Sequence, residues 1–402
     1  MTLGALGFFG GGDPLLAAPR TWFIPSFANV AAFETDEGLL LIDAGMRVMG
    51  PAIYASIRAR SKVPLNTVVF THGHVDHAFG LDAWLAEMDP ARPRIVGHRN
   101  VRARFERYAK MSQLNSRINA TQFGLTDVAW PTEFFYPDTT YDDRLTLTLG
   151  GEDFELIHTR GESDDATWVW APARKVLCTG DFWIGSAPNC GNPQKVQRYA
   201  EDWEATLRTM AELGAEVLLP GHGAPIMGAD TIRTSLLDAA DYLRAIIDTT
   251  LEGLERGLTH DAIVARVRIP EALASKPYLK PSYDRPEFIA RNVIRLHAGW
   301  WNGLPADLLP SLPDQRARAI AELAGGVGAL VARARALAVT DPPLACHLAE
   351  WAQLADPSNR AANEVVRDVF TRRAESEPSL MARNIFRAAA ARAAAALEDR
   401  SS

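Results

Sequence analysis

The stretch Thr71–His77 constrains this 402-residue chain most, because it gathers three histidines and one aspartate within seven positions. The residues just before it, 67–70, are β-branched or aromatic, which predicts a buried strand. Residues 79–85 place apolar side chains at helical spacing. We therefore expect the cluster on a strand-to-helix turn at the end of a sheet, where its side chains converge.

The polar side chains of this turn can face two points a few ångströms apart. Because side chains alternate in extended backbone, His72 and His74 point the same way. Asp76 and His77 continue round the bend toward a second point. Imidazole nitrogens and carboxylate oxygens suit zinc, and also iron and manganese. A single histidine is usually structural, whereas so dense a set predicts a metal site completed by ligands from elsewhere in the chain.

The pattern His72-x-His74-x-Asp76-His77 resembles the signature of the metallo-β-lactamase superfamily. The resemblance implies an α/β fold, the αββα sandwich, with a two-metal site along one edge. It also implies further ligands, each placed after a later predicted strand. The residues at the matching places are Glu162, Asp181 and His222.

Glu162 stands where much of the superfamily has a histidine ligand. A glutamate oxygen binds zinc at nearly the same distance as an imidazole nitrogen, so we expect Glu162 to replace that ligand. Asp164 and Asp165 are the competing donors in the same loop. A turn histidine without a metal is the alternative for His222, but its Pro-Gly-His-Gly context after an apolar strand favours a ligand.

The resemblance divides seven ligands into two sets with one shared member. One metal is expected on His72, His74 and Glu162, the other on Asp76, His77 and His222, with Asp181 bridging. We expect two zinc ions, with manganese or iron as alternatives. The metals would lower the pKa of bound water and polarise the scissile group, and we assign catalysis to the ligands Asp76 and Asp181.

Asp43 ends a predicted hairpin strand, 39–42, close to the metal turn. A carboxylate there can accept a hydrogen bond from a ligand histidine and so fix its tautomer and orientation. A solvated turn aspartate is the alternative, but the superfamily has an aspartate at the matching place. His98 ends the predicted strand 94–98 without a partner at metal-ligand spacing, so we expect a structural role for it.

The loop 188–199 follows Asp181 and is expected to pass near the site with amides and two cations. Arg198 offers a planar fork that matches sulfate or phosphate, and Lys195 offers a point charge. With Asn189 they are our candidate substrate contacts, and a solvated surface loop is the alternative. Arg117, in the polar stretch 110–124, is a further candidate contact for an anion.

The glutamate ligand, the Val-Gln-Arg end of that loop and the helical tail resemble the alkyl sulfatase branch of the superfamily. This resemblance implies hydrolysis of alkyl sulfate esters by a metal-bridging hydroxide. It includes segments similar to the branch's dimerisation region, at 266–270, 276–281, 299–303, 355–359 and 379–383.

The chain departs from the branch at two points. Longer alkyl sulfatases carry a further sterol-carrier-like domain, which this sequence lacks up to Ser402, and residues 121–124 lack a tyrosine-rich pattern. Both departures weigh against a long-chain detergent substrate. A carboxylic ester, lactone, amide or phosphoester is therefore the alternative substrate class for the same metal site.

Helical periodicity dominates from Ala229 onward. We accordingly expect a catalytic domain over 1–228 and an α-helical dimerisation domain over 229–402, and from the resemblance a homodimer. The first long helix begins at Ala229, and Thr259 is expected to cap a short one. Further helices are predicted over 314–337, 341–355, 358–376 and 378–398.

Composition excludes several classes of partner. The net charge is −7 without a long basic run, which argues against nucleic acid. Three scattered cysteines suggest neither disulfides nor a zinc ribbon. No apolar run is long enough to span a bilayer. The start, Met1–Phe9, lacks the basic region of a signal peptide, so we expect a cytoplasmic protein. We expect its substrate to be a small anionic ester.

Three other functions fit the sequence less well. A two-iron redox enzyme is disfavoured because His74 stands where that branch usually has a glutamate, and no flavin-binding half is evident. An RNA-processing nuclease would need a basic arm. A binding protein without activity would have a broken site, whereas here every ligand position is filled.

Overall fold

The fold was analysed in a computed structural model that describes residues 13–87 and 92–398. The segment Met1–Phe9, for which the sequence predicts no signal peptide, lies outside these residues. The chain forms two compact units, of which the second comprises 116–128, 282–284 and the residues from 300 onward. The predicted division into a catalytic part, 1–228, and a dimerisation part, 229–402, concerns function and stays a prediction.

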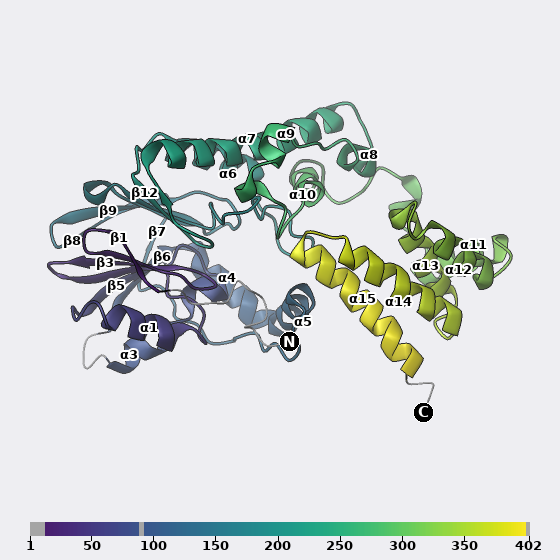
Figure 1. The fold of residues 1–402 in the computed structure, drawn as a ribbon, viewed down its shortest axis with the longest axis horizontal. Coiled ribbons are helices and arrows are strands. Elements are labelled where there is room, and N and C mark those ends of the chain that lie inside the picture. The colour runs from purple at the N-terminus through teal and green to yellow at the C-terminus, as the bar shows by residue number, and fades with distance from the viewer. Residues whose placement is uncertain (1–12, 88–91, 399–402) are drawn as a thin grey trace. The chain divides into compact units, whose positions relative to one another are not determined.

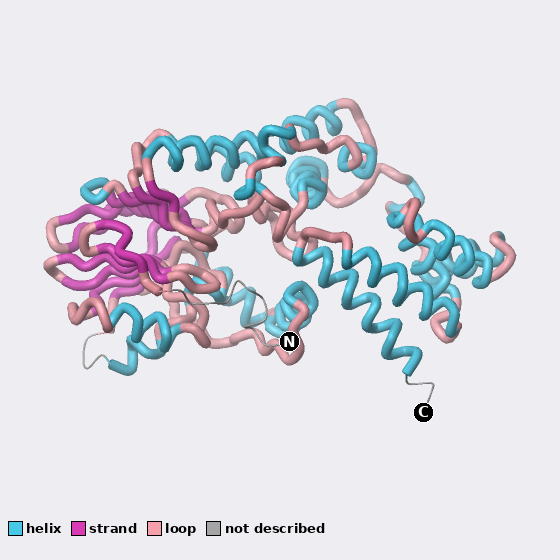
Figure 2. The backbone as a smooth tube through the Cα atoms, viewed as in Figure 1, coloured by secondary structure: helices cyan, strands magenta, loops and turns pink. Residues whose placement is uncertain are grey.

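The first unit contains two β-sheets, of seven and six strands (Figures 1 and 2). The strands of the first sheet lie in chain order, antiparallel up to β4 and parallel from β4 to β7. They are β1 Leu15–Ala18, β2 Thr21–Ile24, β3 Val30–Thr35, β4 Gly38–Ile42, β5 Leu65–Val69, β6 Arg94–His98 and β7 Thr139–Tyr141.

The second sheet has the order β13-β12-β11-β10-β9-β8, and only β11 and β12 run parallel. Its strands are β8 Arg144–Leu149, β9 Glu152–His158, β10 Thr167–Ala171, β11 Val176–Gly180, β12 Val217–Pro220 and β13 Ile226–Met227. All residues of β11 are buried, and Leu177 belongs to a different apolar cluster from its neighbours Val176 and Cys178. Both faces of this sheet are therefore covered, as in the interior of a layered fold.

Helices cover the outer faces of both sheets, and the sheets share an apolar interior in which Phe33 meets Phe154 edge-on at 5.3 Å between ring centroids. Against the first sheet pack α1 Gly50–Arg58, α3 Asp82–Glu87 and α4 Asn100–Lys110. Against the second pack α6 Ala200–Ala211, α7 Ala229–Glu255 and α10 Pro286–Ala298. The predicted αββα sandwich is therefore confirmed.

The first unit also contains the shorter helices α8 His260–Val264 and α9 Glu271–Ala274. Thr259 caps α8 as predicted, because its hydroxyl oxygen accepts a hydrogen bond from the Ala262 amide. The long α7 begins at Ala229, where the apolar periodicity begins in the sequence.

The second unit is helical, as predicted, and its helices pack on a core rich in alanine and valine. They are α11 Pro313–Leu323, α12 Val327–Leu337, α13 Pro342–Ala355, α14 Arg360–Glu375 and α15 Leu380–Glu398, and α5 Ser112–Phe123 contributes its later residues. The single helix predicted over 314–337 is wrong. It breaks at Gly325 and Gly326, whose φ angles of 90° and 113° are incompatible with helix.

Among the described residues, every helix is too short or too polar to cross a membrane.

Candidate metal centre

Four chain segments bring the predicted ligands to one edge of the sandwich. The first follows β5 and leads into the short helix α2 Val75–Ala78, with His74 at its N-cap. The second is the loop between β9 and β10, and the other two follow the parallel strands β11 and β12. Since β5, β11 and β12 all end at this edge, the side chains just after them converge.

The structure arranges the seven predicted ligands in two groups. In each group, one potential ligand atom per residue lies within 4.8 Å of all the others. The first group is His72, His74, Glu162 and Asp181, and the second is Asp76, His77 and His222. This is the division that the resemblance implied. Asp181 meets the 4.8 Å limit with all members of the first group.

The first group is compact, and all its members except the half-buried His74 are buried. His72 Nε2 lies 2.8 Å from His74 Nδ1, and Glu162 Oε2 lies 3.4 Å from His74 Nδ1 and 3.8 Å from His72 Nε2. Glu162 is only 6% exposed, and its Oε2 has no hydrogen-bond partner among the described residues. An unpaired buried carboxylate oxygen is costly, so this atom is suited to a cation.

The second group has its ligand atoms at similar distances. His77 Nε2 and His222 Nε2 are 3.4 Å apart, and Asp76 Oδ2 lies 3.7 Å from the first and 3.5 Å from the second. Asp76 is half-buried, whereas both histidines are buried. This group is therefore the more accessible at its carboxylate.

Asp181 lies between the two groups. Its Oδ2 is 3.6 Å from His72 Nε2, while its Oδ1 is 3.2 Å from His77 Nε2 and 3.4 Å from His222 Nε2. A β-carbon at Gly221 would collide with this carboxylate, so only glycine leaves room for the close approach of the β12 turn. The two oxygens of Asp181 thus face different groups.

These distances fit divalent metal ions. Ligand atoms bonded to one zinc ion at 2.0–2.2 Å in a tetrahedron lie about 3.3 Å apart. The distances within each group scatter around this value, and neutral imidazoles with carboxylates are a donor set that zinc, manganese and iron accept. Nothing in the geometry selects one of these metals.

The carboxylates also set the charge of the histidines. Burial lowers the pKa of His77, but Asp181, Asp43 and Asp76 outweigh it and raise that pKa well above its usual range. His72 behaves oppositely: burial, together with the neighbouring histidines, lowers its pKa well below the usual range. His72 is therefore neutral at pH 7, the form in which an imidazole binds metal.

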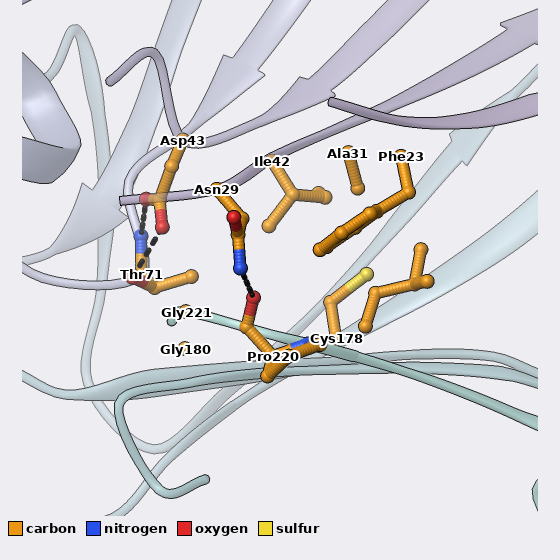
Figure 3. Close-up of a pocket in the computed structure, with 11 residues that line it drawn as sticks. Phe23, Asn29, Ala31, Ile42, Asp43, Thr71, Cys178, Gly180, Pro220 and Gly221 are labelled. Atoms are coloured by element: carbon orange, nitrogen blue, oxygen red, sulfur yellow. Dashed lines mark hydrogen bonds between the residues drawn. The ribbon is translucent and has the colours of Figure 1, made fainter. Parts of the chain in front are cut away.

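Asp43 contacts a predicted ligand histidine, as the sequence suggested. Its Oδ2 lies 2.8 Å from His77 Nδ1, so Nδ1 carries a proton and Nε2 is the ring nitrogen directed at the second group. The same carboxylate accepts hydrogen bonds from the Thr71 amide at 2.7 Å and the Thr71 hydroxyl at 2.8 Å (Figure 3). Asp43 thereby ties the β4 end to the metal turn.

Asn29 and Phe27 hold His222 in a corresponding way, and sequence reasoning missed both. His222 Nδ1 donates to the Phe27 carbonyl oxygen. The Asn29 amide donates to the Pro220 carbonyl oxygen at 3.1 Å (Figure 3). It also donates to the Gly223 carbonyl oxygen at 2.9 Å, so its two acceptors lie on either side of His222 in the chain. These contacts join the two sheets beneath the site, around a cavity of about 10 Å³.

A buried ion pair supports the His72–His74 turn from the other side. Asp165 Oδ2 accepts hydrogen bonds from the Gly73 amide at 2.9 Å and from Arg104 Nε at 2.8 Å. Arg104 Nη2 also donates to Asp164 Oδ1 at 2.6 Å. The competing donors Asp164 and Asp165 are thus engaged with Arg104, which leaves Glu162 as the loop's member of the metal group.

Two of the predicted substrate contacts meet Glu162. Asn189 Nδ2 donates to Glu162 Oε1 at 2.7 Å, and Arg198 Nη1 donates to the same oxygen and to the Asn189 carbonyl. Arg198 is only 3% exposed, and its Nε has no partner in the described part of the chain. The two oxygens of Glu162 are thus divided, one toward the histidines and one toward this pair.

Lys195 lies partly buried on the same loop, with Nζ 5.7 Å from the centre of the Trp130 ring. Burial and the nearby Arg198 lower its pKa to about 8. Arg117 is placed differently, exposed on α5 in the second unit, and its role stays a prediction. His98 stacks on His158 at 3.6 Å between ring centroids and belongs to neither metal group, consistent with a structural role.

Comparison with known proteins identifies two family domains in this chain. The model of the metallo-beta-lactamase superfamily matches residues 24–222, which contain both ligand groups. The model described as alkyl sulfatase dimerisation matches residues 259–395, which cover the helical part from α8 onward.

Individual relatives point to the same branch. A linear primary-alkylsulfatase of a Pseudomonas species is 26% identical over 377 residues, which are 88% of this chain and 71% of the relative. An (R)-specific secondary-alkylsulfatase, also from Pseudomonas, is 26% identical over 391 residues, 89% of this chain but 59% of the relative.

A solved structure has the same fold. The stereoselective inverting sec-alkylsulfatase Pisa1 from Pseudomonas superposes with a TM-score of 0.85 at 23% identity. The match covers 97% of this chain and 66% of that one. The sandwich and the helical region that follows it therefore have the fold of that solved structure.

Proposed function

We propose that this chain, which belongs to the metallo-β-lactamase superfamily and carries the alkyl sulfatase dimerisation domain, is a metal-dependent hydrolase of alkyl sulfate esters. Its relatives named alkylsulfatases cover most of the chain. The observation that carries the proposal is that the two oxygens of Glu162 face different partners. Oε2 faces the histidines of the first group, and Oε1 accepts hydrogen bonds from the buried Arg198 and the Asn189 amide.

In the finer form of the proposal the site is dinuclear. His72, His74 and Glu162 would hold one divalent ion, Asp76, His77 and His222 the other, and Asp181 would bind both through its two oxygens. Two such ions would supply a bridging hydroxide as nucleophile and polarise the ester. Zinc is our proposal for the metal, with manganese and iron as alternatives.

Side chains of the chain itself would recognise the sulfate. With Glu162 in place of a histidine, three carboxylates and a hydroxide balance the charge of two divalent ions, so the metals attract an anion less. Arg198 Nε, a buried donor without a partner among the described residues, is suited to a sulfate oxygen. Asn189 would add an amide and Lys195 a point charge to this sulfate site. The Asn189 amide would also hold Glu162 in place.

The test is sulfate release by metal-replete protein from a panel of short- and long-chain alkyl sulfates. Parallel panels of carboxylic esters, lactones, amides and phosphoesters address the alternative substrate class. We expect sulfate release that Glu162→Ala abolishes. Turnover confined to one of the other panels would contradict the sulfatase assignment but would not contradict the proposed metal centre.

We further propose that the chain forms a homodimer through the region matched by the dimerisation model, 259–395. Light scattering coupled to size-exclusion chromatography should give twice the chain mass of 44.0 kDa. A mass equal to one chain at micromolar concentration would contradict this.

A further inference from the structure

Helix α10, which lies in the region matched by the dimerisation model, contacts the loop that carries Arg198. At one point the two backbones approach so closely that a β-carbon at Gly191 would collide with the main chain at Ile289, so only glycine fits there. Further along the loop, Asn292 of α10 meets the main chain of Arg198. The helix and the loop both belong to the first unit.

The side chain of Asn292 pairs with both polar backbone groups of Arg198. Its Nδ2 donates to the Arg198 carbonyl oxygen at 2.7 Å, and its Oδ1 accepts from the Arg198 amide at 3.4 Å. Arg295 donates to the same Oδ1 at 2.9 Å, which fixes the orientation of the Asn292 amide. Asn292 is only 6% exposed, so these hydrogen bonds lie in a low-dielectric interior that strengthens them.

The next residue ties the same backbone to the loop of Glu162. The Tyr199 amide donates to the carbonyl oxygen of Gly161, the residue before Glu162, at 2.9 Å. The Arg198 main chain thus lies between α10 and the Glu162 loop, while its guanidinium donates through Nη1 to Glu162 Oε1. Two main-chain anchors therefore place this guanidinium on the carboxylate of the first metal group.

We propose that Asn292 is a positioning residue of the candidate metal centre. By holding the Arg198 backbone, it sets the guanidinium on Glu162 Oε1 and aims Nε at the sulfate. The part that concerns sulfate rests on the function proposed above, whereas the part that concerns Glu162 depends only on the metal group. Helix α10 thereby has a role in the site besides the dimerisation for which its family model is described.

Zinc affinity of the apoprotein, measured by competition with a chelator, tests the role at the metal. Loss of a group that orients a metal ligand typically costs about 10–100-fold in metal affinity, so Asn292→Ala should weaken the binding of one zinc ion about tenfold. Arg198→Met should weaken it at least as much, and the double variant should bind no more weakly than Arg198→Met alone. Effects that multiply in the double variant would overturn the proposal, because Asn292 would then act independently of Arg198.

Steady-state kinetics with octyl sulfate tests the role in recognition. In Asn292→Ala, KM should rise about tenfold with a smaller fall in kcat, because substrate binding loses a charged hydrogen bond. In the Arg198→Met background the same substitution should leave KM unchanged. A KM and a zinc affinity that both stay at the wild-type values in Asn292→Ala would overturn the proposal.

Asn363→Ala is the matched control. Asn363 is 2% exposed and donates to the carbonyl oxygens of Pro357 and Asn359 at 3.0 Å each, so its loss should destabilise the fold comparably. It lies on α14 in the helical unit, and both the zinc affinity and KM should stay at the wild-type values. Equal losses in the Asn363 and Asn292 variants would assign the effect to general destabilisation and overturn the proposal.

Asn292→Asp provides a second variant if Asn292→Ala does not fold. It keeps the size of the side chain and the acceptor for Arg295, and it removes the N–H given to the Arg198 carbonyl. Its zinc affinity should fall and its KM should rise, as in Asn292→Ala. A wild type that releases no sulfate would contradict the proposed function and leave the zinc measurements to decide on Asn292. A wild type that binds no zinc would contradict both.

Discussion

The candidate metal centre and the core of the helical second unit are built from different kinds of side chain. The centre packs carboxylates, imidazoles and guanidinium groups into a buried edge, where each charge depends on named partners. The core of the helical unit consists mostly of alanine, valine and leucine, with Ala345, Ala349 and Ala352 fully buried on one face of α13. The metal centre thus depends on the identities of a few specific residues. The helical unit depends instead on a repeating pattern of small apolar residues.

The largest effect on stability should follow the loss of the buried arginine behind the metal turn. Arg104→Met leaves the Asp165 carboxylate buried without its ion-pair partner, which costs about 3–5 kcal/mol of unfolding free energy. Urea denaturation measures this cost. Arg99→Gln, which breaks an exposed pair, should cost about 0–1 kcal/mol. Equal costs for the two would contradict the contrast between buried and exposed charge.

Asp43→Asn should damage the centre without comparable damage to the fold. Asp43 has a φ of 62°, which asparagine also tolerates, so the backbone is preserved. Without the carboxylate, His77 loses the acceptor that fixes its tautomer, and metal affinity should fall about 10–100-fold. Metal titration of the apoprotein measures this. Unchanged affinity would show that Asp43 serves the fold alone.

The helical unit should respond in the opposite way. Ala349→Val adds volume to a fully buried position on α13 and should lower the unfolding free energy by about 1–3 kcal/mol. Metal content per chain should stay at the wild-type value. A loss of metal in this variant would show that metal binding depends on the packing of the helical core, contrary to this prediction.

The smallest predicted effect concerns Lys195, whose pKa is lowered to about 8. Its charge is present below that pH and is lost as the pH rises through it. A charged contact of this kind is worth about 1.5 kcal/mol, so KM for an alkyl sulfate should rise about fivefold between pH 7, where Lys195 is mostly charged, and pH 9, where it is mostly neutral. In Lys195→Met the KM should already be high and this rise should disappear. A rise that persists in the variant would assign the effect to another group.

The sequence sufficed to select the seven residues that the structure gathers into two groups, because they are dense in one turn and follow apolar strands elsewhere. Glu162 could be chosen from its position in a recognisable loop, and the sandwich could be inferred from the same resemblance. The helices α13, α14 and α15 follow from apolar periodicity. Each of these features depends on residues that lie close together in the chain.

Apart from the contact of Asp43 with a histidine of the metal turn, the supporting contacts could not be predicted, because they join distant positions. Arg104 and Asp165 are 61 residues apart, and Asn29 donates to a carbonyl 191 residues away. In the sequence, Arg104 and Asn29 resemble ordinary solvated polar residues, and Asp165 was a candidate metal donor rather than a partner of Arg104. Gly325 and Gly326 form a Gly-Gly pair, which marks turns, so the sequence did carry a signal for the break, and the helix predicted over 314–337 overlooked it.

We propose that the two ligand groups share Asp181 and hold two divalent ions in each chain. Native mass spectrometry of the zinc-loaded protein checks this by counting the ions bound to wild type and to Glu162→Ala. We expect two ions in the wild type and one in the variant, whose second group is intact. A wild type saturated by one ion, or a variant that binds two ions as firmly as the wild type, would contradict the proposal.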